Sequence, residues 1–297
     1  MNNLSKFLDF LAFEKRFSSH TLKSYETDLR QFSGFLAEQY QLENPAEANH
    51  FIIRSWIVEL LEKQVDPRSV ARKLTTIRTY YRYMVRTGEI QRSPMLKVVA
   101  PKVSKKLPEF IDQTRMEQLT EMEIPEDDFT AYRNWFLVDF FYRTGVRRAE
   151  LIGLKVEDIN MAGMVINVTG KRNKQRQIPI SHDFKNEILH YLEMRRKFME
   201  EKGTSTTSFF IGNSGNQITV AFVYRIVKAA VSLVSTGSKR SPHILRHSFA
   251  TAMLNNGADI NSIKELLGHS SLAATQIYTH NSIEKLREVY RRAFPKA

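Results

Sequence analysis

The sequence predicts a mainly α protein of two domains, in which the second domain is mixed α+β and holds a small β-sheet. Residues 1–100 contain four stretches with apolar side chains at helical spacing. A basic, proline-containing linker over residues 101–108 interrupts this periodicity. Residues 109–297 return to helical patterns, and two short strand patterns at 164–168 and 177–180 are typical of a hairpin.

Composition and charge indicate a globular protein with a polyanionic partner. Hydrophobic residues make up 42% of the 297 residues and charged residues 26%, as in domains with sizeable cores. No run of 18 apolar residues and no signal peptide is present, so we expect a cytoplasmic protein without membrane insertion. The absence of cysteine excludes disulfides, thiolate catalysis and Cys-ligated zinc. The net charge of +12 favours a partner such as DNA.

The fourth helical stretch of the first domain carries most of the candidate DNA contacts. The four stretches cover residues 3–14, a segment capped by Ser19, residues 51–64 and residues 67–87. The arginines of the fourth are a pair and then a row at i,i+4 spacing: Arg68 and Arg72, then Arg78, Arg82 and Arg86. Because like charges four residues apart repel one another on a helix, this row is expected to face phosphate groups. A solvated basic face is the alternative.

The linker continues this basic character. Of the net charge, residues 1–106 carry +7, so basicity is densest in the first third of the chain. A basic linker between two DNA-holding domains predicts a clamp around the duplex. We expect Lys105 and Lys106 to cross the DNA backbone.

Near the start of the second domain, an arginine lies between two predicted helices. Gly145 ends one predicted helix, and Glu150 lies in the next. Arg147 is therefore expected at a helix N-terminus.

A second anion site is predicted about a hundred residues later. Ser241 and Pro242 indicate a helix start, and the first turn then presents His243 beside Arg246. An imidazole and a guanidinium at the positive end of a helix are suited to an anion, and phosphate is the anion that we expect.

A zinc site is the alternative for this segment, because His243 and His247 are spaced i,i+4. The metalloprotease pattern requires a glutamate directly after the first histidine, however, and Ile244 occupies that position. We therefore expect no metal site.

Two further polar groups follow at short spacing. Asp259 predicts the cap of a helix that Gly268 ends, and His269 comes directly afterwards. Ser271 predicts a third short helix, which carries Tyr278. A single histidine at a helix start is more often a cap than a catalyst, so each signal is weak alone.

Together these segments resemble the active-site motifs of the tyrosine recombinases, and most of all their bacterial Xer branch. The matching segments are Thr144–Leu151, His243–Arg246, Leu266–His269 and Thr275–His280. The resemblance covers essentially the full chain. It implies that residues 1–100 form a four-helix SAM-like core-binding bundle and that residues 109–297 form the catalytic domain of a site-specific DNA recombinase.

The resemblance implies a role for each residue of the site. Arg147 and Arg246 would neutralise the scissile phosphate, and Glu150 would hold Arg147 in place. Tyr278 would be the nucleophile that forms a 3′-phosphotyrosyl bond. His243 would move protons. Because phosphotyrosine conserves the energy of the broken bond, neither ATP nor Mg²⁺ nor another cofactor is expected.

The hairpin loop over residues 169–176 and His269 complete the implied site. In the family this hairpin delivers a lysine into the minor groove, and Lys171 matches that lysine as the acid for the leaving 5′-oxygen. Arg172, which replaces a glycine often found there, and Lys174 are expected to contact DNA. His269 would hydrogen-bond a nonbridging oxygen. An ordinary polar hairpin tip is the alternative for the loop.

The end of the chain predicts an exchange helix over residues 282–294. Ser282 can cap this helix, and its apolar stripe consists of Ile283, Leu286, Tyr290 and Phe294. In the family this helix packs into the neighbouring protomer, which we expect here. Docking on its own domain is the alternative.

The implied assembly is a homo- or hetero-tetramer with a related recombinase on a double-stranded DNA site. It would resolve chromosome dimers at cell division through a Holliday junction, with a cell-division DNA translocase as activator. A phage or mobile-element integrase and a monomeric type IB topoisomerase would share the chemistry. A non-catalytic DNA-binding accessory protein is a further alternative, but all six active-site positions are filled.

Overall fold

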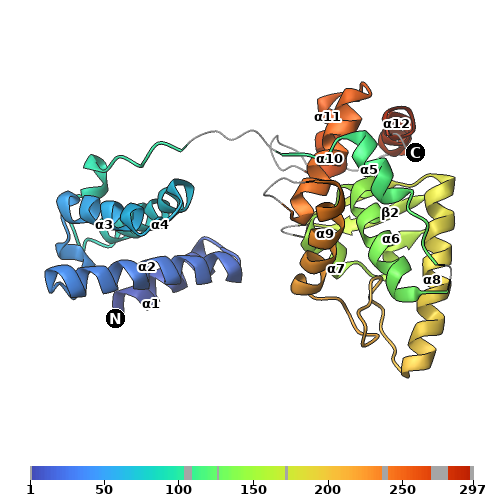
Figure 1. Cartoon of the computed structure of the whole chain (residues 1–297). Coiled ribbons are helices and arrows are strands. Elements are labelled where there is room, and N and C mark those ends of the chain that lie inside the picture. The colour runs from blue at the N-terminus through green and yellow to red at the C-terminus, as the bar shows by residue number, and fades with distance from the viewer. Residues whose placement is uncertain are drawn as a thin grey trace. The chain divides into compact units, whose positions relative to one another are not determined.

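A computed structural model describes residues 2–103, 109–125, 127–170, 173–235, 240–268 and 280–294, with side chains from residue 4 in the first segment and from residue 286 in the last. The chain divides into two compact units, Met1–Lys106 and Leu107–Ala297 (Figure 1). Each unit has its own hydrophobic core. Within the described residues, no helix is both long and apolar enough to cross a membrane.

The first unit is helical, as the sequence predicts. Its elements are α1 (Asn2–Asp9), the π-helical turn η1 (Phe10–Glu14), α2 (Ser19–Tyr40), η2 (Pro45–Glu47), α3 (His50–Glu62), α4 (Pro67–Arg86) and η3 (Pro94–Lys97). The first predicted helix is thus divided into an α and a π part. The cap of α2 is Ser18, whose hydroxyl accepts a hydrogen bond from the Thr21 amide, and not Ser19.

The core of the first unit lies between these helices. Phe32 and Trp56 pack with their ring centroids 4.9 Å apart, which joins α2 to α3. Tyr81 of α4 is fully buried, and its hydroxyl donates to the Pro45 carbonyl at 2.7 Å. A buried tyrosine hydroxyl that finds such a partner fixes the orientation of its helix.

The second unit consists of helices and one small sheet. Its elements are α5 (Gln113–Thr120), α6 (Phe129–Thr144), α7 (Arg148–Gly153), η4 (Val156–Asp158), β1 (Ile159–Asn160), β2 (Val165–Thr169), β3 (Gln175–Pro179), α8 (His182–Lys202), α9 (Val220–Val234), α10 (Pro242–Asn255), α11 (Ile260–Leu267) and α12 (His280–Ala293).

The sheet is antiparallel in the order β1-β2-β3. Ile166 pairs with Ile178 and Thr169 with Gln175, which confirms the predicted hairpin. β3 begins two residues earlier than predicted. β1 was not predicted, because two residues are too short for a recognisable alternation.

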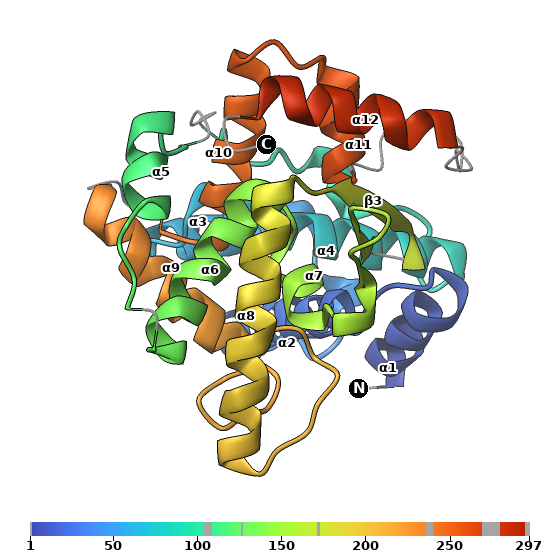
Figure 2. The same ribbon diagram turned by 90° about the vertical axis from the view of Figure 1, so that its right-hand side faces the viewer.

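Helix α6 is the central element of the second unit. It is buried on most sides, and α5, α8, α9 and α10 pack against it (Figure 2). A helix that is apolar over most of its surface belongs in a core. Because α6 ends at Thr144, the residues that follow it lie in the middle of the domain.

Helix α12 lies beside α10, α11 and β3 of its own unit (Figure 2). Leu286, Tyr290 and Phe294 are buried there, and the Tyr290 hydroxyl donates to the Arg143 carbonyl at 3.1 Å. The Phe294 ring also packs on Phe249, with centroids 5.5 Å apart. These three residues of the predicted stripe are thus buried on their own domain in this single chain, and the side chain of Ile283 lies outside the described residues. Docking on a neighbouring protomer stays a prediction for the assembled complex.

Candidate active site

A glycine turn after α6 positions Arg147. Gly145 ends the helix in the left-handed conformation, with φ at +58°, and a Cβ there would lie 2.6 Å from the Phe249 ring. Arg147 then caps α7, and the Glu150 carboxylate accepts its backbone N–H at 2.8 Å and its Nη1 at 2.7 Å. The predicted support of Arg147 by Glu150 is present in the structure as these two bonds.

Arg246 enters the same place from α10. Its side chain is buried and donates from Nη1 to the Gly145 carbonyl and from Nη2 to the Leu267 carbonyl at 2.6 Å. Burial, and then the charges of Arg147 and Arg176, lower the pKa of Arg246 to about 9. It makes no ion pair with a carboxylate in the part of the chain that the structure describes. A buried cation in this setting is suited to bind an anion.

His243 lies one turn before Arg246 on α10 and keeps part of its surface exposed. Partial burial, and then the charges of Arg148 and His247, lower its pKa below the ordinary value, with Arg246 and Arg147 contributing less. The imidazole is therefore neutral at pH 7 and can accept a proton.

Arg176 is a member of this cluster that we did not predict from the sequence. It is buried on β3 and donates from Nη1 and Nη2 to the two oxygens of Glu150, at 3.0 and 2.9 Å. Its Nε donates to the Leu266 carbonyl at 2.7 Å. One sequence signal does exist, because Arg176 alternates with Ile178 and Ile180 and so falls on the buried face of the strand.

The three arginines meet at the C-terminal end of α11. Arg176, Arg246 and Arg147 donate, in that order, to the consecutive carbonyls of Leu266, Leu267 and Gly268, and the last of these bonds is 2.8 Å long. Carbonyls at a helix C-terminus lack helical partners and carry partial negative charge. The structure thus brings Arg147, Glu150 and Arg246 together around this helix end, with His243 nearby.

Three predicted catalytic residues lie outside the described residues. They are Lys171, His269 and Tyr278. His269 follows directly after Gly268, the left-handed cap of α11 that the sequence predicted.

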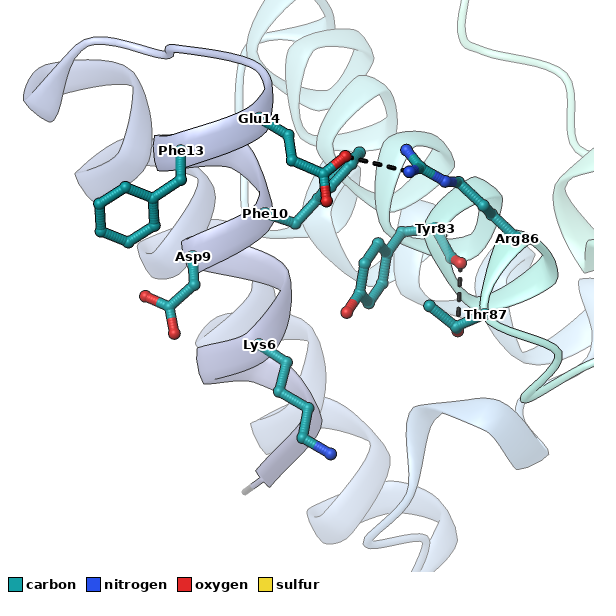
Figure 3. A pocket seen from close by; sticks show the side chains of 8 residues that line it. All are labelled: Lys6, Asp9, Phe10, Phe13, Glu14, Tyr83, Arg86 and Thr87. Carbon is teal, nitrogen blue, oxygen red and sulfur yellow. Dashed lines mark hydrogen bonds and ion pairs between the residues drawn. The ribbon is translucent and has the colours of Figure 1, made fainter.

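Two arginines predicted as DNA contacts have acidic partners in the structure, and their contact with DNA stays a prediction. Arg72 binds Asp28 of α2 with both Nη atoms, although half of its side chain stays exposed. Arg86 donates to Glu14 at 3.0 Å and lies 4.9 Å from the centre of the Phe10 ring (Figure 3). The acids lie 44 and 72 residues away in sequence, so the spacing of basic residues along α4 does not reveal them.

The remaining candidates differ in their surroundings. Arg68, Arg78 and Arg82 make no ion pair with any other residue whose side chain is described. Lys174 is exposed beside β3. Lys105, Lys106 and Arg172 are outside the described ranges.

Comparisons with known proteins agree with this geometry. Residues 109–285 match the model of the phage integrase family, and residues 4–88 match the phage integrase N-terminal SAM-like domain. Tyrosine recombinase XerC of Pelobacter propionicus is 38% identical over 298 residues, which cover 100% of this chain and 96% of the relative. XerC of Halalkalibacterium halodurans is 36% identical over 297 residues, covering 99% and 97%. A XerH recombinase bound to palindromic difH DNA in a post-cleavage complex has the same fold, with a TM-score of 0.68, 19% identity and coverage of 96% of this chain and 83% of that one.

The chain therefore belongs to the phage integrase family and is a site-specific tyrosine recombinase. Its full-length relatives place it in the Xer branch of that family.

Proposed function

We propose that this recombinase cuts and rejoins DNA at a specific site through a 3′-phosphotyrosyl intermediate, and that it resolves chromosome dimers at cell division. The observation that carries the proposal is the convergence of Arg147 and the buried Arg246 on one helix end. Each guanidinium has N–H groups beyond those used in these bonds, and two such groups suit the two nonbridging oxygens of a phosphodiester.

The first chemical step balances without an outside reagent. The Tyr278 oxygen forms a bond to phosphorus while the bond from phosphorus to the 5′-oxygen breaks. The tyrosine proton passes to neutral His243, and Lys171 supplies a proton to the leaving 5′-oxygen. Arg147 and Arg246 stabilise the charge that grows on the nonbridging oxygens, and His269 adds a hydrogen bond.

The second step reverses the first with a new strand. The 5′-hydroxyl of the partner duplex attacks the phosphotyrosine, which restores Tyr278 and joins the two duplexes in a Holliday junction. Because one phosphoester replaces another, no nucleotide cofactor is needed.

The assembly that we propose is a tetramer on double-stranded DNA, formed with itself or with a related recombinase in the cytoplasm and activated by a cell-division DNA translocase. The name of the full-length relatives supports the recombinase activity, and the DNA-bound XerH complex supports the double-stranded DNA partner. Arg68, Arg78, Arg82 and Lys174 would hold the duplex, together with the linker over residues 101–108.

The decisive experiment traps the covalent intermediate on a nicked suicide duplex. Tyr278→Phe should abolish the protein–DNA adduct and leave DNA binding nearly unchanged, because only a hydroxyl is removed. Tyr224→Phe, at an exposed tyrosine of α9, is the matched control and should form the adduct normally. An adduct at wild-type yield in Tyr278→Phe would refute the assignment, and loss of cleavage in EDTA would favour a metal mechanism.

A further inference from the structure

We propose that Arg176 is a positioning residue for strand cleavage, which acts through Glu150 on the guanidinium of Arg147. This role rests on the catalytic role proposed for Arg147. The resemblance to the recombinases gave a role to Lys171 in this hairpin but none to Arg176.

Arg176 and Arg147 together saturate the Glu150 carboxylate. Each of its oxygens accepts one bond from Arg147 and one from Arg176, at distances from 2.7 to 3.0 Å. Burial alone would raise the pKa of this carboxyl, but the bonds and charge of Arg176, followed by those of Arg147, lower it overall. Arg176 thus provides half of the hydrogen bonds that keep the buried carboxylate ionised.

The Arg147 guanidinium donates to two acceptors, the Glu150 carboxylate and the Gly268 carbonyl. It gives Nη1 to Glu150 but Nη2 to the Gly268 carbonyl, so its plane spans from α7 to the end of α11. Without Arg176, two lone-pair positions of a buried carboxylate would be left unsatisfied. The Arg147 guanidinium would then turn both nitrogens towards Glu150, and it would leave the place from which it can reach a phosphate.

The hydrogen-bond partners of Arg176 require an arginine, and a lysine could not bind all of them. The Arg176 Nε donates to the Leu266 carbonyl, while Nη1 and Nη2 donate to Glu150. One planar guanidinium therefore binds two acceptor groups that lie in different directions. Lysine cannot reproduce this fork. Two glycines also leave room for Arg176 and its partner Glu150. A Cβ on Gly268 would lie 3.0 Å from Cδ of Arg176, and a Cβ on Gly170 would lie 3.1 Å from Oε1 of Glu150.

The formal charge of the cluster also supports a role for Arg176 in cleavage. Three arginines and one carboxylate leave the cluster with a formal charge of +2. A phosphodiester carries one negative charge, and its pentavalent transition state carries two. The cluster therefore matches the transition state better than the ground state, and removal of Arg176 reduces cleavage more than it reduces DNA binding.

The test compares Arg176→Lys with Arg195→Lys. Arg195 is another buried arginine of this domain, and its hydrogen bonds within the described residues go to the carbonyls of Thr206, Ser208 and Phe209. Melting temperature, affinity for a one-site duplex and the single-turnover rate of suicide-substrate cleavage are measured for both. Arg176→Lys should slow cleavage on the order of 10-fold to 100-fold, as supporting residues of active sites do, with affinity within about threefold. Arg195→Lys should lower melting temperature without slowing cleavage by folded protein.

Arg147→Lys separates the positioning role from the function on which it rests. If Arg176 acts through Arg147, the double variant Arg147→Lys/Arg176→Lys should be about as slow as Arg147→Lys alone. Rate reductions that multiply, or a wild-type rate in Arg176→Lys, would overturn the positioning role. If Arg147→Lys itself cleaved at the wild-type rate, the proposed role of Arg147 would fail instead.

A second variant covers the case in which Arg176→Lys does not fold. Gly170→Ala keeps every charge of the cluster and adds one methyl group against Oε1 of Glu150. It should slow cleavage in the wild-type background but not further in the Arg147→Lys background. An unchanged rate, or an equal reduction in both backgrounds, would contradict the positioning role.

Discussion

At the scale of single residues, the properties of the site follow from positive charges placed close together. Arg147, Arg148 and Arg246 all act on His243, and each favours its neutral form. The sign follows directly: a histidine whose pKa lies below its ordinary value stays neutral down to a lower pH. His243, the base that we propose for proton removal from Tyr278, is therefore in its neutral form at neutral pH.

The first prediction concerns the pH dependence of cleavage. The single-turnover rate should stay level from pH 8 to pH 7 and fall on the acid side with an apparent pKa below 6.5, when His243 gains a proton. Arg148→Ala should move this apparent pKa upwards, because a neighbouring positive charge is removed. Arg115→Ala is the control, since this exposed arginine pairs with Asp112 and should leave the profile unchanged. A rate that already halves at pH 7 would contradict the neutral imidazole.

A second prediction concerns Asp28 in the first unit. This carboxylate is buried and accepts bonds from Arg72, Lys73 and Thr76. Burial alone would raise its pKa, but these partners lower it below the ordinary value. Its stabilising effect is therefore present above the unfolded pKa and disappears as the pH falls through the folded pKa.

Asp28→Asn should therefore destabilise the first unit by about 3 kcal/mol at pH 7, since it leaves a cationic cluster without its anion. Chemical denaturation at pH 7 and pH 3 measures this destabilisation, which should shrink at the lower pH. Glu26→Gln, which breaks only the exposed pair with Arg30, should cost at most about 1 kcal/mol. Equal destabilisation by the two variants would rule out the buried role of Asp28.

At the scale of the elements, the sequence predicted the parts that depend on local chemistry. The cap Asp259 and the left-handed glycines Gly145 and Gly268 mark helix ends where the structure has them. These signals act over three or four residues, so they can be recognised without a fold. The predicted placement of Arg147 at the start of a helix depends on Gly145, which ends one helix, and on Glu150 in the next.

Pairing between distant residues could not be predicted in this way. The partner of Arg72 lies 44 residues away, and that of Arg86 lies 72 residues away. Glu150 and Arg176 are 26 residues apart, and Leu266 is 90 residues from Arg176. Pairing of this kind depends on which helices pack together, which a spacing pattern along one helix does not contain.

These partners divide the basic face of α4 into two groups, and this yields a third prediction. Arg78→Ala/Arg82→Ala should flatten the dependence of log affinity on log salt by roughly 0.9 for each phosphate that the protein no longer neutralises. Arg86→Ala should change the slope less, because Glu14 already neutralises that side chain. Titrations of a one-site duplex at several salt concentrations measure both slopes. If Arg86→Ala had the larger effect, the pair with Glu14 would have to open on DNA.

At the scale of the whole molecule, α12 links folding to assembly. Leu286 and Phe294 are buried in the core beside α10, and the Tyr290 hydroxyl donates to the Arg143 carbonyl at the end of α6. The same helix is the one that we expect to move to a neighbouring protomer in the assembled complex. If α12 moves to a neighbouring protomer, the site that it leaves on its own domain becomes exposed. The thermal stability of the free chain therefore shows whether α12 occupies that site.

The last prediction is made for the chain lacking residues 282–297. If α12 stays on its own domain in solution, the deletion uncovers Phe249 and Tyr142, which Phe294 now covers. Removing even one such buried aromatic side chain costs about 3 kcal/mol, so the DNA-free catalytic unit should melt several degrees lower. Leu286→Ala should show a smaller drop of the same kind, whereas Leu254→Ala, at an exposed position of α10, should show none. Recombination of a two-site substrate, measured well below the melting temperature, should also disappear because no helix remains for exchange. A truncated protein that melts like the full chain, at any protein concentration, would mean that α12 is already away from its own domain before DNA is bound.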